Sequence, residues 1–298
     1  MAIFVRFVAP DVNNGILTAK NAVMLYGNHI FKVKGSMADM RNGLRLFVLL
    51  ALLVAPGVVL AETRVIHVLV ALCDNASQGI VPVPAKIGNG DDPANNLYWG
   101  CAYGVSAYMQ KQPGWTLVRK IKDPQPGIYE RLVFKAKNHD VYMVADAYAG
   151  REIRQTTIDL LDFAAGLRPV AVTLEDGGAV SAGGGADLLV YVGHNGLMDF
   201  TLERIPVFVD AKSRDVAVFA CASKQYFEQV ITLTGAHPLA LTTNLMSPEA
   251  YSLAALAEGW INGESAAQIH ERLAQAYHKY QKCGLKGARN LFSCMDRE

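Results

Sequence analysis

Two kinds of hydrophobic pattern follow one another along residues 62–298. Continuous apolar runs at 64–73 and 215–223 predict strands that are buried on both faces of a sheet. Further strands are expected at 140–150, 187–192 and 237–244. By contrast, the segments "GWTLVRKIK" (114–122) and "ERLVFKAK" (130–137) alternate apolar with polar residues, which is the pattern of strands with one solvent-facing side.

Amphipathic stretches lie between these strands and predict helices at 96–112, 151–166, 224–235, 247–263 and 264–282. Ser247 and Ser265 are the expected helix starts, and Gly166 and Gly235 the expected stops. Strands alternating with helices predict an α/β domain whose mostly parallel sheet is flanked by helices. Three segments are expected to be loops, at 74–96, 177–186 and 284–293. Residues 62–298 contain no internal repeat, so we expect them to form one domain.

The N-terminal region has the pattern of a secretory signal peptide. Arg41 and Arg45 precede a leucine-rich core at 46–60, and a small residue, Ala61, follows it. We expect residues 37–61 to be this signal peptide, with cleavage after Ala61; an uncleaved anchor and a buried helix are the alternatives. The apolar run is shorter than the roughly 20 residues that span a bilayer. Residues 1–36 are interpreted as an upstream extension from a mis-called start. The protein is therefore expected to be exported, to the periplasm or beyond the cell.

Composition excludes fewer classes of function than the signal-peptide pattern does. The 298 residues are 51% hydrophobic, carry a formal charge of +1 and contain no basic block, which argues against a nucleic-acid binder. Export permits disulfides between the five cysteines. Cys283 and Cys294 flank a short loop and are the most plausible pair, while Cys73 with Cys101 is a second possibility; sequence alone does not fix the connectivity. An odd count leaves one thiol over, and Cys221 is the natural candidate.

Two apolar strands end in side chains that can do chemistry. The strand at 188–192 leads to His194, and the strand at 216–220 leads to Cys221. If these strands are parallel neighbours, both side chains emerge at one edge of the sheet, where ligands bind in open α/β sheets. An imidazole can take the proton of a thiol, and the resulting thiolate is a nucleophile. Taken singly, each residue is more often structural, a buried thiol or a polar turn residue.

Other candidate sites lack the required pattern. The loop at 88–96 has acidic residues but not the spacing of a calcium loop, and 177–187 lacks the lysine of a phosphate loop. The histidines outside the 193–196 turn show no zinc-ligand spacing. No metal and no cofactor are therefore expected. Asp199 could bind a basic substrate group, but the end of a turn is the favoured interpretation.

The segments "GHNG" and "FACAS", each after a strand, resemble the caspase-like cysteine peptidases, the group of caspases, gingipains, clostripain and CHAT domains. The helix segment before the histidine strand and the closing helices are also similar, so the resemblance covers roughly residues 140–280. It implies a three-layer sandwich, His194 as the base, Cys221 as the nucleophile, and an oxyanion hole from backbone N–H groups near Asn195-Gly196 and at Cys221. The family has glycine directly after the histidine; here Asn195 intervenes.

The sequence thus predicts an exported caspase-like cysteine peptidase that hydrolyses a peptide or protein substrate. Two alternatives remain open. The first is a catalytically inactive caspase-like protein that binds a peptide or an envelope partner. The second is a small-molecule binding protein that uses the cleft at the strand ends. Neither the oligomeric state nor the residue preferred before the cut follows from the sequence.

Overall fold

The computed structural model describes residues 63–297 and five short strands nearer the N-terminus. Contacts divide the chain into two compact units, Met1–Leu60 and Ala61–Glu298. The first unit contains a three-stranded antiparallel sheet and a two-stranded hairpin, formed by β1 (Val5–Phe7), β2 (Asp11–Asn13), β3 (Ile16–Thr18), β4 (Ala22–Tyr26) and β5 (His29–Val33). The predicted signal peptide at 37–61 lies outside the described residues, so its cleavage stays a prediction.

The second unit is built on one eight-stranded sheet, whose order is β15-β14-β13-β12-β6-β9-β8-β7. Five neighbouring strands run parallel: β14 (His237–Thr242), β13 (Asp215–Phe219), β12 (Leu188–Val192), β6 (Arg64–Ala71) and β9 (Val141–Tyr148). Three antiparallel strands complete the two edges: β15 (Phe292–Cys294), β8 (Ile128–Ala136) and β7 (Trp115–Gln125). The parallel centre matches the continuous apolar runs. The alternating segments form β7 and β8 at one edge; β7 is partly exposed as predicted, but β8 is buried along most of its length, so the solvent-facing side predicted for 130–137 is wrong.

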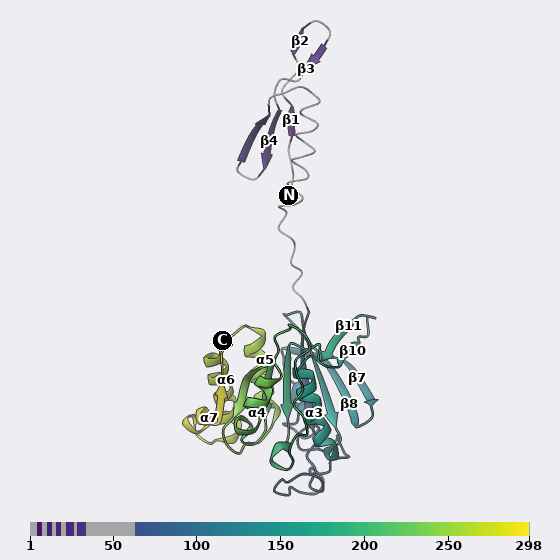
Figure 1. Cartoon of the computed structure of the whole chain (residues 1–298), viewed down its shortest axis with the longest axis vertical. Helices are drawn as coiled ribbons and strands as arrows, with labels where there is room; N and C mark the ends of the chain where they lie inside the picture. Colours follow the sequence, from purple (N-terminus) through teal and green to yellow (C-terminus); the bar gives the residue numbers. More distant parts are fainter. Residues whose placement is uncertain are drawn as a thin grey trace. The chain divides into compact units, whose positions relative to one another are not determined.

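Helices cover both faces of this sheet, as Figure 1 shows, so the fold is an α/β sandwich of three layers. One face packs against α3 (Ile153–Ala164) and α4 (Ser223–Leu233). The other packs against α2 (Val105–Met109), α5 (Ala250–Ile261), α6 (Ala266–Gln281) and α7 (Leu285–Leu291). Among the helices within 63–297, none combines the length and the apolarity needed to cross a bilayer.

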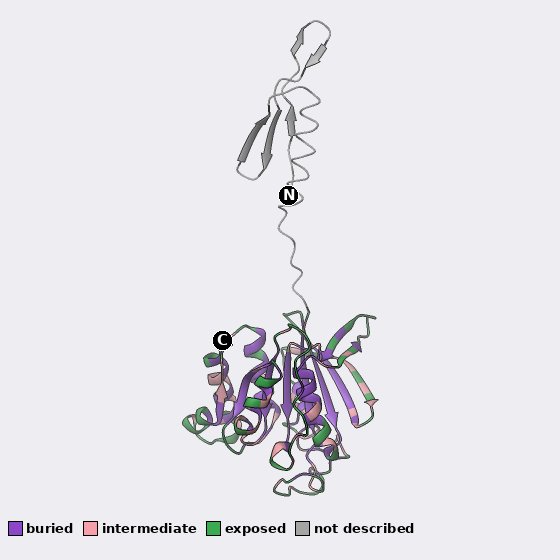
Figure 2. Ribbon diagram, in the orientation of Figure 1, coloured by how far each residue is buried: buried purple, intermediate pink, exposed green. Residues whose placement is uncertain are grey.

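Strand β6 explains why a continuous apolar run, and not an alternating one, encodes the sheet centre. Ile66, Val68 and Val70 point into the core under α5 and α6. Val65 and Leu69 point the other way, toward α3. Successive side chains of a strand face opposite sides, so a strand covered on both faces needs apolar residues at nearly every position. Figure 2 shows these central strands buried along their length.

Three of the four predicted helix signals are confirmed and one is wrong. Ser265 caps α6: its hydroxyl accepts the N–H of Gln268, and the Gln268 side chain accepts the N–H of Ser265, a complete capping box. Gly166 follows the end of α3 and Gly235 follows the end of α4, as predicted. Ser247, however, does not start α5, whose N-cap is Glu249. Ser247 instead lies in the loop before α5, and its N–H donates to the Tyr277 hydroxyl at 3.0 Å.

The segment 96–112 is mostly turns and not the predicted helix, because only Val105–Met109 is helical. The cause is the buried side chain of Asn96. Its Oδ1 accepts the N–H groups of Cys73 and Tyr98 at 3.0 and 3.1 Å, and its Nδ2 donates to the Cys73 carbonyl at 2.8 Å. These bonds fold the chain back onto the end of β6. A side chain that satisfies the backbone in this way competes with helix formation.

Two segments predicted as loops are ordered elements. The glycine-rich approach at 177–186 contains β11 (Ala179–Gly183), which forms an antiparallel hairpin with β10 (Pro169–Thr173) outside the main sheet. The stretch 284–293 forms α7 and the beginning of β15. The two predictions were wrong for different reasons: β11 pairs with the neighbouring strand β10 despite its glycines, whereas 285–291 form a short helix and only β15 pairs with a strand distant in the chain, β14.

A cluster of buried polar and charged side chains lies in the sheet, under α3. Asp146 is fully buried and accepts two hydrogen bonds of 2.7 Å from Arg131, while His67 Nε2 lies 3.1 Å from the same carboxylate. His67 Nδ1 accepts the N–H of Gly183 at 3.0 Å, so the ring proton is on Nε2 and points to Asp146. The group joins β6, β8, β9 and β11 through paired charges, as buried charges require.

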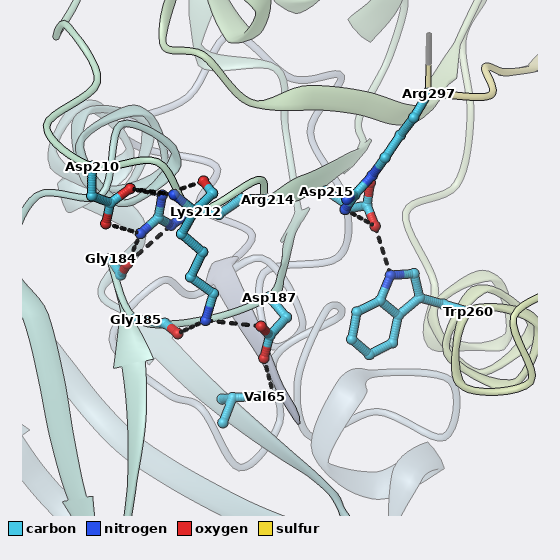
Figure 3. A network of polar contacts seen from close by, with 10 residues as sticks. All are labelled: Val65, Gly184, Gly185, Asp187, Asp210, Lys212, Arg214, Asp215, Trp260 and Arg297. Carbon is cyan, nitrogen blue, oxygen red and sulfur yellow. Dashed lines mark hydrogen bonds and ion pairs between the residues drawn. The ribbon is translucent and has the colours of Figure 1, made fainter. Parts of the chain in front are cut away.

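The amino-terminal ends of the parallel strands are held by a second polar network (Figure 3). Asp215, the first residue of β13, accepts hydrogen bonds from Trp260 Nε1 at 2.8 Å and from Arg297 Nε at 2.9 Å. Nearby, Asp187 pairs with Lys212 at 2.8 Å just before β12. The start of β13, which leads to Cys221, is therefore fixed by side chains from α5 and from the segment after β15. The start of β12, which leads to His194, is fixed by Lys212 from the loop before β13.

Candidate active site

Strands β12 and β13 bring the turns of His194 and Cys221 side by side. They are parallel neighbours in register, with Leu188 opposite Asp215 and Val192 opposite Phe219. His194 and Cys221 each follow the last paired residue of their strand by two positions. The prediction that both residues emerge at the carboxyl edge of one sheet is confirmed. Their chemical roles stay a prediction.

The backbone at Gly193 allows the chain to turn sharply into His194. Gly193 has φ +153°, and its N–H donates to the Phe219 carbonyl at 3.3 Å, so the turn stays attached to β13. A Cβ at this position would lie 2.9 Å from the Ala71 carbonyl oxygen of β6. Only glycine fits both the conformation and the contact. The imidazole that follows is buried, with a residue exposure of 7%.

The His194 ring is fixed by a carboxylate. Nε2 of His194 lies 2.9 Å from Oδ2 of Asp199, and the same oxygen accepts the N–H of Gly79 at 2.9 Å. Asp199 does end a turn, as expected, because it is the C-cap of the short 3-10 helix η2 (Gly196–Met198). That interpretation was incomplete, because the carboxylate also binds the histidine. Sequence could not show the contribution of Gly79, which belongs to the long loop after β6.

Asn195 connects the two turns directly. Its Nδ2 donates to the carbonyl of Cys221 at 2.7 Å, and its Oδ1 accepts the N–H of Leu197 at 3.1 Å. The residue is completely buried. Gly196 comes next, and a Cβ there would lie 2.8 Å from the Phe200 ring. The asparagine between His194 and Gly196 therefore clamps the cysteine turn and caps η2.

Cys221 lies half-buried at the start of the turn that leads into α4. Ala222 has φ +50°, a left-handed conformation, and its N–H donates to the Asn244 carbonyl at 2.9 Å. The Cys221 sulfur accepts the N–H of Met246 at 3.4 Å and lies 3.6 Å from the Met246 carbonyl oxygen. The loop after β14 thus supplies a backbone contact to the sulfur. No sequence signal marked Met246.

The predicted oxyanion hole uses the backbone N–H groups of Asn195, Gly196 and Cys221. Within residues 63–297, no hydrogen bond is found for the N–H of Asn195, Gly196 or Cys221. Unpaired N–H groups beside a nucleophile are the arrangement that stabilises a developing oxyanion. This role stays a prediction.

The other cysteines differ from Cys221 in their surroundings. Burial raises the pKa of the Cys73 thiol to about 11 and that of Cys294 to about 12, so both are protonated near neutral pH. Burial also raises the pKa of Cys101. Cys283 is exposed, and none of the five thiols is paired in the structure. A disulfide between Cys283 and Cys294, or between Cys73 and Cys101, stays a prediction for the oxidised protein.

Within residues 63–297, no three His, Cys, Asp or Glu side chains are placed together to hold a metal ion. No family model, no curated protein and no solved structure matches this chain. The resemblance to caspase-like peptidases is therefore untested by comparison. Function is inferred from the geometry of the His194 and Cys221 turns and from the groups that hold them.

Proposed function

We propose that the protein is a caspase-like cysteine peptidase that uses His194 and Cys221. The observation that carries the proposal is the 2.7 Å hydrogen bond from Asn195 Nδ2 to the Cys221 carbonyl. It holds the turn of an imidazole and the turn of a thiol together at the carboxyl edge of parallel strands, where α/β sheets bind their ligands. The half-buried sulfur of Cys221 distinguishes it from the deeply buried thiol of Cys73.

The chemistry would be acyl transfer in two steps. His194 takes the proton of the Cys221 thiol, and the thiolate sulfur forms a bond to the carbonyl carbon of a peptide. The carbon–nitrogen bond then breaks, and the leaving amine takes the proton from His194. A water molecule, deprotonated by His194, attacks the thioester carbon; the carboxylic acid leaves and the thiol is restored. The N–H groups of Asn195, Gly196 and Cys221 would stabilise the oxyanion in both steps.

Substrate binding would change the contacts of the Cys221 sulfur. The sulfur lies near both the N–H and the carbonyl of Met246. A thiol that donates to the Met246 carbonyl keeps its proton, so reaction with a substrate requires the S–H to turn from that carbonyl toward His194. The Met246 N–H, in contrast, can remain a donor to the thiolate and stabilise its charge.

The test is covalent labelling with a peptidyl acyloxymethyl ketone, followed by mass mapping of the modified cysteine. Cys221 should react at least about tenfold faster than Cys283, the exposed thiol of the same molecule, because its proton is removed by His194. His194→Ala should remove this advantage, and Cys221→Ala should leave only the slow labelling of Cys283. Hydrolysis of fluorogenic peptides should be lost in the same two variants.

Equal labelling of Cys221 and Cys283 would overturn the peptidase proposal. The remaining interpretations would then be an inactive caspase-like protein that binds a peptide or envelope partner, and a small-molecule binding protein. Binding that survives in both His194→Ala and Cys221→Ala would point to one of these two.

We also propose that the protein acts outside the cytoplasm, in the periplasm or beyond the cell, on a peptide or protein substrate. The support is the pattern at 37–61, which has a positive start, an apolar core and a small residue before the cut. Expression of the full chain in a bacterium, with mass measurement of the envelope fraction, tests it. A protein that begins at Glu62 supports export; the uncut chain in the cytoplasmic fraction contradicts it.

A further inference from the structure

We infer that Asp199 is a positioning residue for His194: it keeps the ring proton on Nε2 and so leaves Nδ1 as the nitrogen that exchanges a proton with Cys221. This inference rests on the proposed function and goes beyond the two-residue site. The observation is the 2.9 Å contact between His194 Nε2 and Asp199 Oδ2, on a ring that is nearly buried.

The state of the ring follows from what each atom can do. A carboxylate only accepts hydrogen bonds, so the nitrogen that faces Asp199 must carry the proton. In the neutral imidazole, Nδ1 is then unprotonated and able to accept one. When His194 takes the thiol proton, the carboxylate also stabilises the imidazolium that forms, as the acid does in a Ser-His-Asp triad.

Asp199 is itself held in place from outside its own turn. The N–H of Gly79 donates to Asp199 Oδ2 at 2.9 Å, and the carboxylate packs closely on the Gly79 Cα, where a Cβ would collide with Oδ1. The loop between β6 and α2 therefore sets the position of the carboxylate. The next residue back, Gln78, is buried and anchors this loop by donating to the carbonyls of Leu72 and Gly150 at 2.8 and 3.0 Å.

Two substitutions separate the position of the carboxylate from its chemistry. Asp199→Asn keeps the size of the side chain and can still accept the Gly79 N–H through its oxygen. Because the same oxygen of Asp199 accepts from Gly79 and faces His194 Nε2, the amide oxygen keeps this place, and the substitution removes the negative charge without removing the acceptor. Gly79→Ala keeps Asp199 but pushes its carboxylate away from the ring. Asp176→Asn is the matched control, because Asp176 is exposed and accepts only the N–H of Gly178 in the turn of the β10–β11 hairpin.

The first measurement is the ¹⁵N spectrum of the histidine rings, which distinguishes a protonated from an unprotonated ring nitrogen. The signals of His194 are identified by their loss in His194→Gln. Above neutral pH we expect Nε2–H in the wild type, in Asp176→Asn and in Asp199→Asn, because an oxygen still faces Nε2 in all three. A wild-type His194 ring that carries its proton on Nδ1 would overturn the inference. This measurement does not require the protein to be active.

The second measurement is the rate of Cys221 labelling by the peptidyl electrophile at pH 7, with Cys283 as the internal reference. In the Ser-His-Asp triad the carboxylate-to-amide change costs about 10⁴ in turnover; a thiol is more acidic than a hydroxyl, so we expect a loss of about 10² for Asp199→Asn. Gly79→Ala should lose at least about tenfold. In both variants the Cys283 rate and the thermal unfolding midpoint should stay close to those of the wild type.

The outcomes separate the two proposals. If the wild type labels Cys221 rapidly and Asp199→Asn does so equally fast, the role of Asp199 is wrong and the peptidase proposal stands. If the wild type shows no advantage of Cys221 over Cys283, the peptidase proposal fails, while the ¹⁵N spectrum still decides which ring nitrogen of His194 carries the proton beside Asp199.

Discussion

The side chain of Asn195 is hydrogen-bonded to the main chain of Cys221, so the histidine turn and the cysteine turn form one rigid unit. The asparagine occupies the position at which this chain departs from the caspase-like pattern. Its amide bridges 26 residues of sequence. The departure is thus part of what positions the site, and it does not by itself imply loss of activity.

Replacement of Asn195 should destabilise the protein and slow the labelling of Cys221. Asn195→Ala removes the donor to the Cys221 carbonyl and the acceptor for the Leu197 N–H, and each buried group left unpaired costs about 1–3 kcal/mol. Urea unfolding should show this loss. The control is Asn138→Ala, at an exposed turn, which should change the free energy of unfolding by less than about 0.5 kcal/mol. Equal stability of the two variants would contradict the clamp.

Gly193→Ala should cost about 1–3 kcal/mol of unfolding free energy, because it places a Cβ at φ +153° and 2.9 Å from the Ala71 carbonyl oxygen. The matched substitution is Gly287→Ala, in α7, where a Cβ would meet nothing within 4 Å. It should stabilise the protein by about 0.5–1 kcal/mol, since alanine favours a helix more than glycine does. The measurement is thermal or urea unfolding. Two variants that behave alike would show that the turn at Gly193 is not strained.

Asp146 should make the stability depend on pH in acid. Burial by itself raises the pKa of this carboxyl, but the hydrogen bonds from Arg131 and His67 outweigh it and hold the pKa below its usual value. A lowered folded-state pKa gives a contribution that is complete above the unfolded-state pKa, about 3.9, and is lost as the pH falls through the folded-state pKa. Stability should therefore fall with acidification below about pH 4.

Asp146→Asn tests this assignment. It leaves the Arg131 charge without its carboxylate, so it should cost about 3–5 kcal/mol near neutral pH. The variant should also lose less stability than the wild type between pH 4 and pH 2, approximately. Urea unfolding at several pH values measures both effects, with Asp176→Asn as the exposed control. A wild-type acid slope retained in Asp146→Asn would rule out Asp146 as its source.

At the amino-terminal ends of the parallel strands, Asp215→Ala and Arg297→Ala should differ in how much they destabilise the protein. Asp215 is buried and satisfies Trp260 Nε1 and His237 Nδ1, so its removal leaves buried donors unpaired and should cost about 2–3 kcal/mol. The Arg297 side chain is 46% exposed, and its ion pair should contribute no more than about 1 kcal/mol. Comparison of the urea unfolding midpoints shows which substitution destabilises the protein more. A larger loss of stability in Arg297→Ala than in Asp215→Ala would contradict this explanation.

The sheet and the edge that carries the site could be predicted from the sequence. Continuous apolar runs such as 64–71 mark strands covered on both faces, and the parallel arrangement then brings His194 and Cys221 to one edge. The helix predicted over 96–112 was wrong because the Asn96 side chain, tied to the end of β6, competes with the backbone. That contact depends on the folded position of β6 and is absent from any local pattern.

The supporting groups of the site could not be predicted for a related reason. Gly79 and Met246 contribute backbone N–H groups, which every residue except proline possesses, so residue type carries no signal. Asp199 has an informative side chain, but only the path of the loop after β6 shows that it faces an imidazole and not solvent. The residue types of His194 and Cys221 thus marked this edge in the sequence, whereas the geometry around them depends on several loops.

The place of β15 in the sheet has a consequence for biogenesis. This strand pairs with β14, yet α5, α6 and α7 separate the two in the chain. During synthesis or translocation, one side of β14 stays without a hydrogen-bonding partner until all three helices have emerged. Unpaired strand edges invite association with other chains. A nascent chain that pauses before residue 292 would therefore expose this edge, and assistance from a chaperone would be most needed in that interval.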